Sequence, residues 1–244
     1  MNFFYIFLIL LIITFFLNSF LVKKNLLLDS RKISKHKNFT QSKGKISYVG
    51  GFIILITCIF FWIEKDYNFI IFSSLIFIIG IFSDLGLLKS PLKRFFLQSI
   101  AILAFLILYE TGISSIRIEF LDHFIQNKII NLFFTTFCIL IVINGSNFMD
   151  GVNTLTTGYF MLILLSLLFI FSNNQVVLLN YDLVIITIIV LLVVFIFNIF
   201  GKIYLGDNGA YLIAFIVSII LIDVEKNNIL ISPYYVANLL WYPA

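Results

Sequence analysis

The chain has 244 residues, of which 61% are hydrophobic and only 11% charged, and its formal net charge is +4. Soluble domains contain about 45–50% apolar and about 25% charged residues, so this composition excludes a soluble globular domain. A disordered chain needs the opposite composition, and a disulfide framework is excluded because both cysteines lie inside apolar runs. The remaining class is an all-α, polytopic integral membrane protein.

Apolar runs that approach the length of a membrane-spanning helix, about 20 residues, recur along the whole sequence. In chain order they cover residues 2–22, 46–63, 69–82, 95–109, 129–143, 159–171, 176–200, 211–222 and 229–244. We predict a transmembrane helical bundle of eight to nine spans, in which Pro233 interrupts the ninth, as a single integral-membrane domain over residues 1–244. A chain that stops inside an apolar run favours a truncated sequence over a naturally short relative.

The basic residues predict which side of the membrane each loop occupies. No basic residue precedes the first run and Lys23 and Lys24 follow it, which is typical of an uncleaved anchor with its N-terminus outside. In this orientation the predicted cytosolic loops hold 12 of the 16 Lys and Arg residues, which follows the positive-inside rule. The net positive charge therefore mainly reflects the membrane topology, although it also favours binding of anionic lipid and anionic ligands. Nucleic acid is a poor fit, because the chain has no compact soluble basic domain.

Four of the 12 acidic residues fall on the predicted cytosolic side, each in a different segment. They are Asp29, Asp84, Asp150 and Asp207. Ionisable residues inside or beside membrane spans are functional by default, so we predict that these carboxylates contribute to one shared site. The alternative is that the loops simply need polar residues.

A segment rich in amide and acid side chains covers residues 144–154. Asn144, Asn147 and Asp150 are spaced by three residues, which on a helix places three oxygen-bearing side chains along one face. Mg²⁺ prefers oxygen ligands, and Asn and Asp also suit hydrogen bonding to a nucleotide. The alternative is a polar capping turn, which is weak here because amide and acid side chains recur through the whole segment between two apolar runs.

Two further polar segments adjoin predicted helices. Residues 206–209 read Gly-Asp-Asn-Gly and open a helix, whose N-terminus favours anions, and Lys202 shortly before them is a phosphate candidate. Asp207 is also a natural capping residue, which is the structural alternative. Gly50 and Gly51 begin another helix and could equally form a packing patch of small residues.

The predicted loop between residues 82 and 95 combines an acid with basic residues. Asp84 ends one run, and Lys93 and Arg94 open the next. Basic charge at a helix start opposes the helix macrodipole, so an anionic group nearby would relieve it. Positive-inside anchoring explains Lys93 and Arg94 about as well, but it does not explain Asp84.

Four motifs occur along the sequence in a fixed order. They are Asp-x-Arg-Lys-x3-His ahead of Gly-Gly, an Asp-bearing loop followed by Ser-Pro-x-Lys-Arg, Asn-x2-Asn-x2-Asp-Gly, and Asn followed by Lys-x3-Gly-Asp-x-Gly. In this order they resemble the polyprenyl-phosphate N-acetylhexosamine-1-phosphate transferases, glycosyltransferase family 4, over roughly residues 25–215. That family includes phospho-N-acetylmuramoyl-pentapeptide transferase and undecaprenyl-phosphate N-acetylglucosamine-1-phosphate transferase. No single motif is specific to this family. The four motifs together, in this order and on one predicted membrane face, are specific to it.

The resemblance implies a reaction and its partners. A UDP-N-acetylhexosamine gives its sugar-1-phosphate to undecaprenyl phosphate in the bacterial inner (plasma) membrane, and UMP leaves. This is the first membrane step of cell-wall polysaccharide, O-antigen or peptidoglycan-type glycan synthesis. Because two phosphorylated reactants meet, a metal must screen their charge, which implies a Mg²⁺-dependent phosphotransferase with Mn²⁺ as the alternative ion. The expected partners are undecaprenyl phosphate, the UDP-sugar and membrane lipid, and a homodimer is left open.

The resemblance also implies roles for single residues. Asp207 and Asp150 are the predicted metal ligands. Asp84 matches the second acid of the family's Asp-Asp pair, which is tied to binding or deprotonating polyprenyl phosphate, so Asp84 and Asp150 are the predicted catalytic residues. The predicted substrate-binding residues are Asn144, Asn147, Asn198, Asn153, Lys45 and Lys202.

Three departures from the family pattern bear on activity. Ser83 stands where the family has the first acid of the Asp-Asp pair, and Asn153 stands where relatives often carry Asp, at a position expected near the nucleotide base. The family also continues through more spans and a His-rich cytosolic loop that helps to bind the sugar, whereas this chain ends at Ala244. A degenerate, non-catalytic paralogue is therefore an alternative.

Two other membrane classes fit less well. A CDP-alcohol phosphatidyltransferase needs a dense run of Asp and Gly residues that this sequence lacks. A membrane transporter would place ionisable residues near the midplane and show internal repeats, whereas the acids here sit at helix ends and no repeat is visible. Residues 144–153 resemble the polysaccharide and O-antigen branch of the family, which makes the peptide-bearing muramoyl substrate less favoured.

Overall fold

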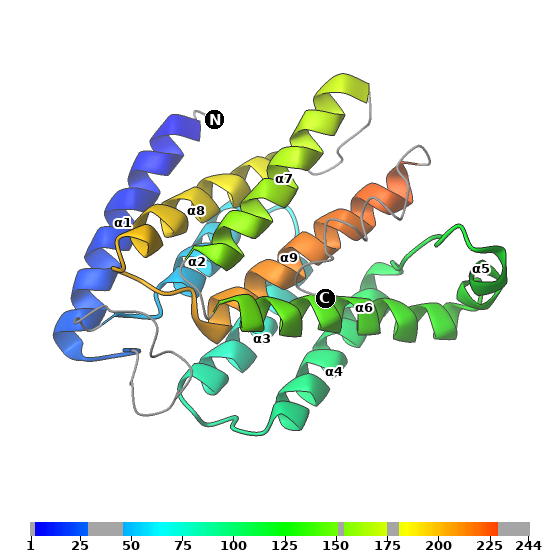
Figure 1. Ribbon diagram of the computed structural model, residues 1–244, viewed down its shortest axis with the longest axis horizontal. Coiled ribbons are helices and arrows are strands. Elements are labelled where there is room, and N and C mark those ends of the chain that lie inside the picture. The colour runs from blue at the N-terminus through cyan, green and yellow to red at the C-terminus, as the bar shows by residue number, and fades with distance from the viewer. Residues whose placement is uncertain (1–2, 29–45, 151–153, 175–180, 229–244) are drawn as a thin grey trace.

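The computed structural model describes residues 3–28, 46–150, 154–174 and 181–228, which form a bundle of helices (Figure 1). In chain order the helices are α1 (Phe3–Lys24), α2 (Gly50–Trp62), α3 (Tyr67–Asp84), α4 (Pro91–Tyr109), α5 (Glu119–Ile125), α6 (Lys128–Met149), α7 (Leu155–Asn174), α8 (Tyr181–Ile199) and α9 (Gly206–Asn227). Within these ranges, β-structure is limited to isolated bridges from Ser47 to Leu28 and Ile203. The predicted all-α class is confirmed.

Six of the described helices are long and apolar enough to cross a membrane, namely α1, α3, α4, α6, α8 and α9, while the apolar helices α2 and α7 are shorter. Each of the first eight apolar runs in the sequence therefore coincides with a helix, and the chain is an integral membrane protein. The ninth run, residues 229–244, lies outside the described residues. The number of crossings and their orientation stay predictions.

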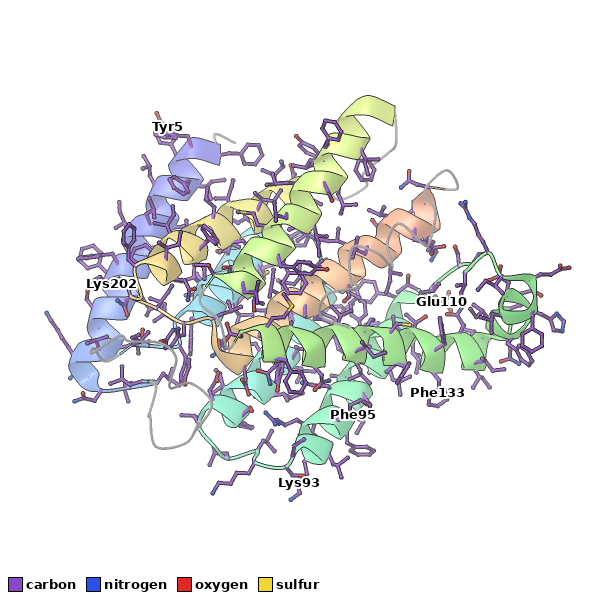
Figure 2. All side chains as sticks on the ribbon, viewed as in Figure 1. Tyr5, Lys93, Phe95, Glu110, Phe133 and Lys202 are labelled. Atoms are coloured by element: carbon purple, nitrogen blue, oxygen red, sulfur yellow. The ribbon has the colours of Figure 1, made fainter. Side chains whose placement is uncertain are left out.

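Helix α9 runs through the middle of the bundle (Figure 1) and packs against α2, α3, α6 and α7. Its side chains are buried on every side from Asn208 to Ser218. A helix that is buried all round belongs to the core rather than to the surface. The outer helices instead expose large apolar side chains, and Tyr5, Phe95 and Phe133 point away from the bundle (Figure 2), as expected of side chains that face lipid.

The start of α9 fits tightly between α2 and α3 because both neighbours present glycine. A Cβ atom at Gly80 of α3 would lie 2.3 Å from the Cα of Asn208, and one at Gly51 of α2 would lie 2.6 Å from the main-chain nitrogen of Gly209. These distances are far inside van der Waals contact, so neither position has space for a side chain. This packing agrees with the small-residue alternative for Gly50 and Gly51 and fixes where α9 begins.

Candidate functional site

The first turn of α9 is where three separate segments bring carboxylates together. Gly206 opens the helix with φ of +74°, a backbone conformation that favours glycine. Its N–H donates to Oδ2 of Asp150, which follows the last residue of α6, at 3.1 Å. The acid predicted on the α6 face therefore meets the start of α9 directly.

Asp84, the last residue of α3, receives three hydrogen bonds from the same turn. The main-chain N–H of Asp207 donates to its Oδ1 at 2.9 Å, and the N–H and the side-chain amide of Asn208 donate to its Oδ2 at 3.0 and 2.5 Å. A helix leaves its first four N–H groups without partners inside the helix, and a carboxylate there also complements the macrodipole. Asp84 and Asp150 thus cap α9 from two other helices, and the anion expected at this helix N-terminus is supplied by the protein itself.

The Asp207 side chain points to a different set of partners. Its Oδ2 accepts from the Ser83 hydroxyl at 2.5 Å and from Nη1 of Arg94 at 3.1 Å. The same Nη1 donates to the Ser83 oxygen at 2.6 Å, so the three groups form a closed triangle across α3, α4 and α9. The side chains of Arg94 and Asp207 are 20% and 25% exposed, which leaves the ion pair accessible to a ligand.

Tyr211 and Asn147 extend this network into α6. Nη1 of Arg94 lies 3.3 Å from the Tyr211 hydroxyl, to which the Asn147 side-chain amide donates at 3.4 Å. Asn144, one turn earlier on α6, instead donates to Oε1 of the fully buried Gln98 at 3.3 Å. The predicted polar face of α6 exists, but only Asn147 and Asp150 reach the cluster at the start of α9.

Two further predicted site residues, Asn198 and Lys202, have no hydrogen bond or ion pair with this cluster. Asn198 is buried and donates to the Ile203 carbonyl at 2.8 Å while it accepts from the main-chain N–H of Thr154, so it ties the end of α8 to neighbouring backbone. Lys202 is exposed (Figure 2). It forms no ion pair with any acid that the structure describes. Asp29, the fourth acid of the predicted shared site, Lys45 and Asn153 lie outside the described residues.

The charges of the cluster favour a divalent cation. The carboxylates of Asp84, Asp150 and Asp207 gather at the start of α9, where Asp207 also pairs with the guanidinium of Arg94. Among the described residues, no group of three His, Cys, Asp or Glu side chains is placed to hold a metal by itself. Mg²⁺ usually binds through one or two carboxylates together with substrate phosphates and water, and this donor set fits that mode.

Arg94 and Tyr211 are site residues that sequence reasoning missed. Arg94 was accounted for by positive-inside anchoring, and Tyr211 lies in a run of apolar residues. One signal pointed to Arg94: basic charge at the start of a helix is unfavourable unless an anion is near. That anion is Asp207, which is 113 residues away in the sequence.

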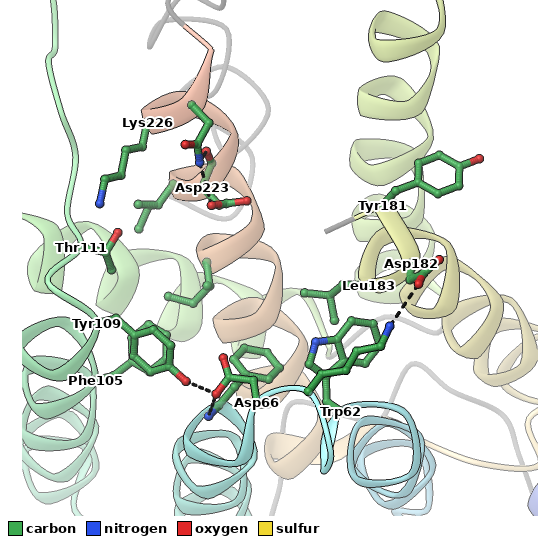
Figure 3. Close-up of a pocket in the computed structure, with 15 residues that line it drawn as sticks. Trp62, Asp66, Phe105, Tyr109, Thr111, Tyr181, Asp182, Leu183, Asp223 and Lys226 are labelled. Atoms are coloured by element: carbon green, nitrogen blue, oxygen red, sulfur yellow. Dashed lines mark hydrogen bonds and ion pairs between the residues drawn. The ribbon is translucent and has the colours of Figure 1, made fainter. Parts of the chain in front are cut away.

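A cavity of about 580 Å³ lies at the other end of α9 and contains none of the predicted site residues (Figure 3). Its three carboxylates already have protein partners. Asp66 accepts from the Phe69 N–H and the Tyr109 hydroxyl, Asp182 pairs with Lys65 at 3.1 Å, and Asp223 accepts from the Asn227 amide. The cluster at the start of α9 is therefore the candidate active site.

The fold and this cluster define an integral membrane protein with an acidic, cation-suited site at one end of a helical bundle. The sequence profile described as glycosyl transferase family 4 matches residues 66–225, which is more than half of the chain and includes Asp84, Asp150 and Asp207. The chain therefore belongs to this family, the polyprenyl-phosphate N-acetylhexosamine-1-phosphate transferases. Comparison with curated proteins gave no match. Family membership implies a phosphotransferase that moves a sugar-1-phosphate to polyprenyl phosphate, and the family is generally Mg²⁺-dependent.

Proposed function

We propose that this chain transfers an N-acetylhexosamine phosphate from a UDP-sugar to undecaprenyl phosphate in a bacterial inner membrane and releases UMP. The observation that carries the proposal is the convergence of Asp84, Asp150 and Asp207 on the first turn of α9, inside the part of the chain that matches the family. A site at the end of membrane helices suits a soluble nucleotide sugar and a lipid-borne acceptor.

The reaction exchanges one phosphorus–oxygen bond for another. A phosphate oxygen of the acceptor bonds to the phosphorus that carries the sugar, and the bond from that phosphorus to the oxygen retained by UMP breaks. UMP leaves with the electron pair. A phosphate monoester has its second pKa near 6, so the attacking oxygen is largely ionised at neutral pH, and the site has mainly to position the reactants and offset their negative charge.

We propose that Asp207, together with Asp150, holds the Mg²⁺, which when bound polarises the diphosphate and screens its charge. Oδ2 of Asp207 is fixed by Ser83 and Arg94, while no described residue donates to its Oδ1. Asp84 contributes by fixing the α9 backbone, because its two oxygens accept from Asp207 and Asn208. These roles position the metal without requiring a second acid at residue 83.

Arg94 is the proposed phosphate-binding cation of the site. Only its Nη1 has acceptors among the described residues, so the Nε and Nη2 donors are available for a phosphate. A guanidinium presents its donors as a planar fork that matches phosphate geometry. Asn147 belongs to the same network because its side-chain amide donates to the Tyr211 hydroxyl. We propose that it connects the metal-binding residues to the bound nucleotide.

Replacing Ser83 with alanine is expected to lower kcat/KM for transfer by about tenfold, because a hydrogen bond to a charged group contributes about 1.5 kcal/mol. The change removes both the donor to Asp207 and the acceptor of Arg94. Ser99→Ala is the matched control, since the Ser99 hydroxyl donates only to the Phe95 carbonyl on its own helix. If both variants retain wild-type kcat/KM, Ser83 has no part in the site.

The experiment that tests the proposed function is UMP exchange into a UDP-sugar by detergent-purified protein with its polyprenyl phosphate acceptor. We expect labelled UMP to enter UDP-N-acetylhexosamine in the presence of Mg²⁺ and the exchange to stop when EDTA removes the metal. Solute flux through protein-containing liposomes without any exchange would instead support the transporter. Absence of both activities in folded protein would support the non-catalytic paralogue, which the Ser83 departure favours.

A further inference from the structure

Helix α5 is an amphipathic element at the end of the bundle away from the candidate active site. Helical spacing places Phe120, Leu121 and Phe124 on one side of it and Glu119 and His123 on the other. It lies in the connection between α4 and α6, and Figure 1 shows it at the end of α6, outside the main body of the bundle. Both neighbouring helices are long and apolar enough to cross the membrane, so α5 lies at the level where they leave it.

The apolar side of α5 is mostly uncovered. The side chains of Phe120 and Phe124 are 71% and 45% exposed, and their rings contact each other edge to face at a centroid distance of 5.0 Å. Ile125 is the only residue of this helix that is buried. Two adjacent aromatic rings left in water are unfavourable, so these side chains need a partner that the described part of the chain does not provide.

The connection that carries α5 is held firmly by side chains from the bundle. The buried carboxylate of Glu225 on α9 accepts from the main-chain N–H groups of Ser114 and Ser115 at 3.0 and 3.3 Å and from the Ser114 hydroxyl. Asn131 on α6 donates to the Ile125 carbonyl at 3.2 Å. The exposed rings therefore have a defined position relative to α6 and α9.

A second carboxylate fixes the connection from within. Asp122 accepts from the Ile116 N–H at 2.6 Å and from the Ser115 hydroxyl at 2.8 Å. These donors hold the pKa of the Asp122 carboxyl below its usual range. The carboxylate therefore stays ionised at neutral pH, and the hydrogen bonds are lost only as the pH falls through that lowered pKa.

The exposed apolar surface of α5 continues that of α6. Ile129, Phe133 and Phe137 are spaced by four residues along one line of α6 and are 66%, 62% and 55% exposed. Because α6 is a candidate membrane span, this line of side chains faces lipid, and Figure 2 shows Phe133 pointing away from the bundle. The line leads along α6 towards the start of that helix, where α5 lies.

We propose that α5 lies in the membrane interface opposite the candidate active site and inserts Phe120 and Phe124 into the boundary between headgroups and acyl chains. Aromatic side chains are enriched at this level, and amphipathic helices with a polar second face lie in it. A second copy of the chain is a poorer occupant, because a stable protein interface needs about 800 Å² from each partner and α5 has only two helical turns.

This anchor would set the level of α9 in the membrane. Glu225 joins the α5 connection to α9, and Asp207 lies 18 residues earlier on the same helix, about 27 Å away at 1.5 Å per residue. That distance is close to the hydrocarbon thickness of a bilayer, about 30 Å. Fixing Glu225 at one interface therefore holds the acidic cluster at the other.

The test uses nitroxide labels on single cysteines placed on the two sides of α5 in bilayer-reconstituted protein, with Cys58 and Cys138 replaced by alanine. Phe120→Cys and Phe124→Cys probe the apolar side, and Glu119→Cys and His123→Cys are the matched controls on the polar side. The collision rates of each label with lipid-soluble oxygen and with a water-soluble nickel complex are measured. We expect the ratio of oxygen to nickel collision rates to be several-fold higher for labels at positions 120 and 124 than for labels at positions 119 and 123.

Two results of the labelling experiment would overturn the proposal. Equal access of the nickel complex to all four labels would mean that the apolar side of α5 faces water. Spin–spin broadening at position 120 that weakens when the protein is diluted in lipid would mean that a second copy covers this side. If a cysteine variant does not fold, the second measurement is quenching of Trp fluorescence by brominated lipids in the Phe120→Trp variant. Emission that brominated lipids do not quench would also reject lipid contact.

Discussion

Replacing Asp207 with asparagine is expected to lower kcat for sugar-phosphate transfer by about a hundredfold or more, because the proposed metal loses its principal charged ligand. Thermal unfolding should stay close to that of the wild type. The main-chain N–H of residue 207 still donates to Asp84, and an amide oxygen can still accept from Ser83. The measurement is transfer of radiolabelled sugar phosphate to lipid, paired with a melting curve in detergent.

Asp182→Asn is the matched control for this variant. Asp182 is likewise an aspartate in an ion pair with a basic side chain, at 3.1 Å from Lys65, but it is more exposed and lies at the other end of the bundle. Its replacement should leave turnover unchanged. If Asp207→Asn retains wild-type turnover, the metal ligand assigned to the start of α9 is wrong.

Replacing Asp84 with asparagine should lower activity and stability together. An amide presents one acceptor oxygen in place of two, so at least one of the N–H groups of Asp207 and Asn208 loses its partner, and the negative charge at the helix N-terminus is lost. We expect a loss of about 1–3 kcal/mol in the free energy of unfolding and at least about tenfold in kcat, since displacement of Asp207 follows.

Asp66→Asn separates the structural part of this effect from the chemical part. Asp66 caps α3 through the Phe69 N–H at 2.9 Å and accepts from Tyr109, far from the candidate active site. Its variant should lose stability and retain kcat. An Asp84→Asn protein with wild-type kcat and lowered stability would show that Asp84 is only a cap.

The bundle could be predicted from the sequence because lipid leaves the backbone few alternatives. Backbone polar groups in hydrocarbon must be satisfied within the chain, so each long apolar run becomes a helix. The predicted bounds were too short where polar residues continue a helix. The run 129–143 is part of α6, which extends to Met149 through Asn144 and Asn147. Helix α5 was missed because it has only seven residues and lies between apolar runs.

The sequence predicts the acids of the candidate site, but it does not predict the hydrogen bonds that join their segments. The sequence predicts that Asp84, Asp150 and Asp207 contribute to one site, because each ends or begins an apolar run on the same predicted membrane face. It gave no means of seeing that two of these acids cap the helix that carries the third. Such contacts join residues 56 and 123 positions apart and depend on the packing of whole helices.

The direct measurement of the central claim is product analysis with purified wild-type protein, UDP-N-acetylhexosamines, undecaprenyl phosphate and Mg²⁺. Mass spectrometry of the lipid phase and assay of UMP in the aqueous phase would follow the two products together. We predict one sugar-linked undecaprenyl diphosphate for each UMP released, and neither product in EDTA. Folded protein that forms neither product from any UDP-N-acetylhexosamine, or forms both at the same rate in EDTA, would contradict the account.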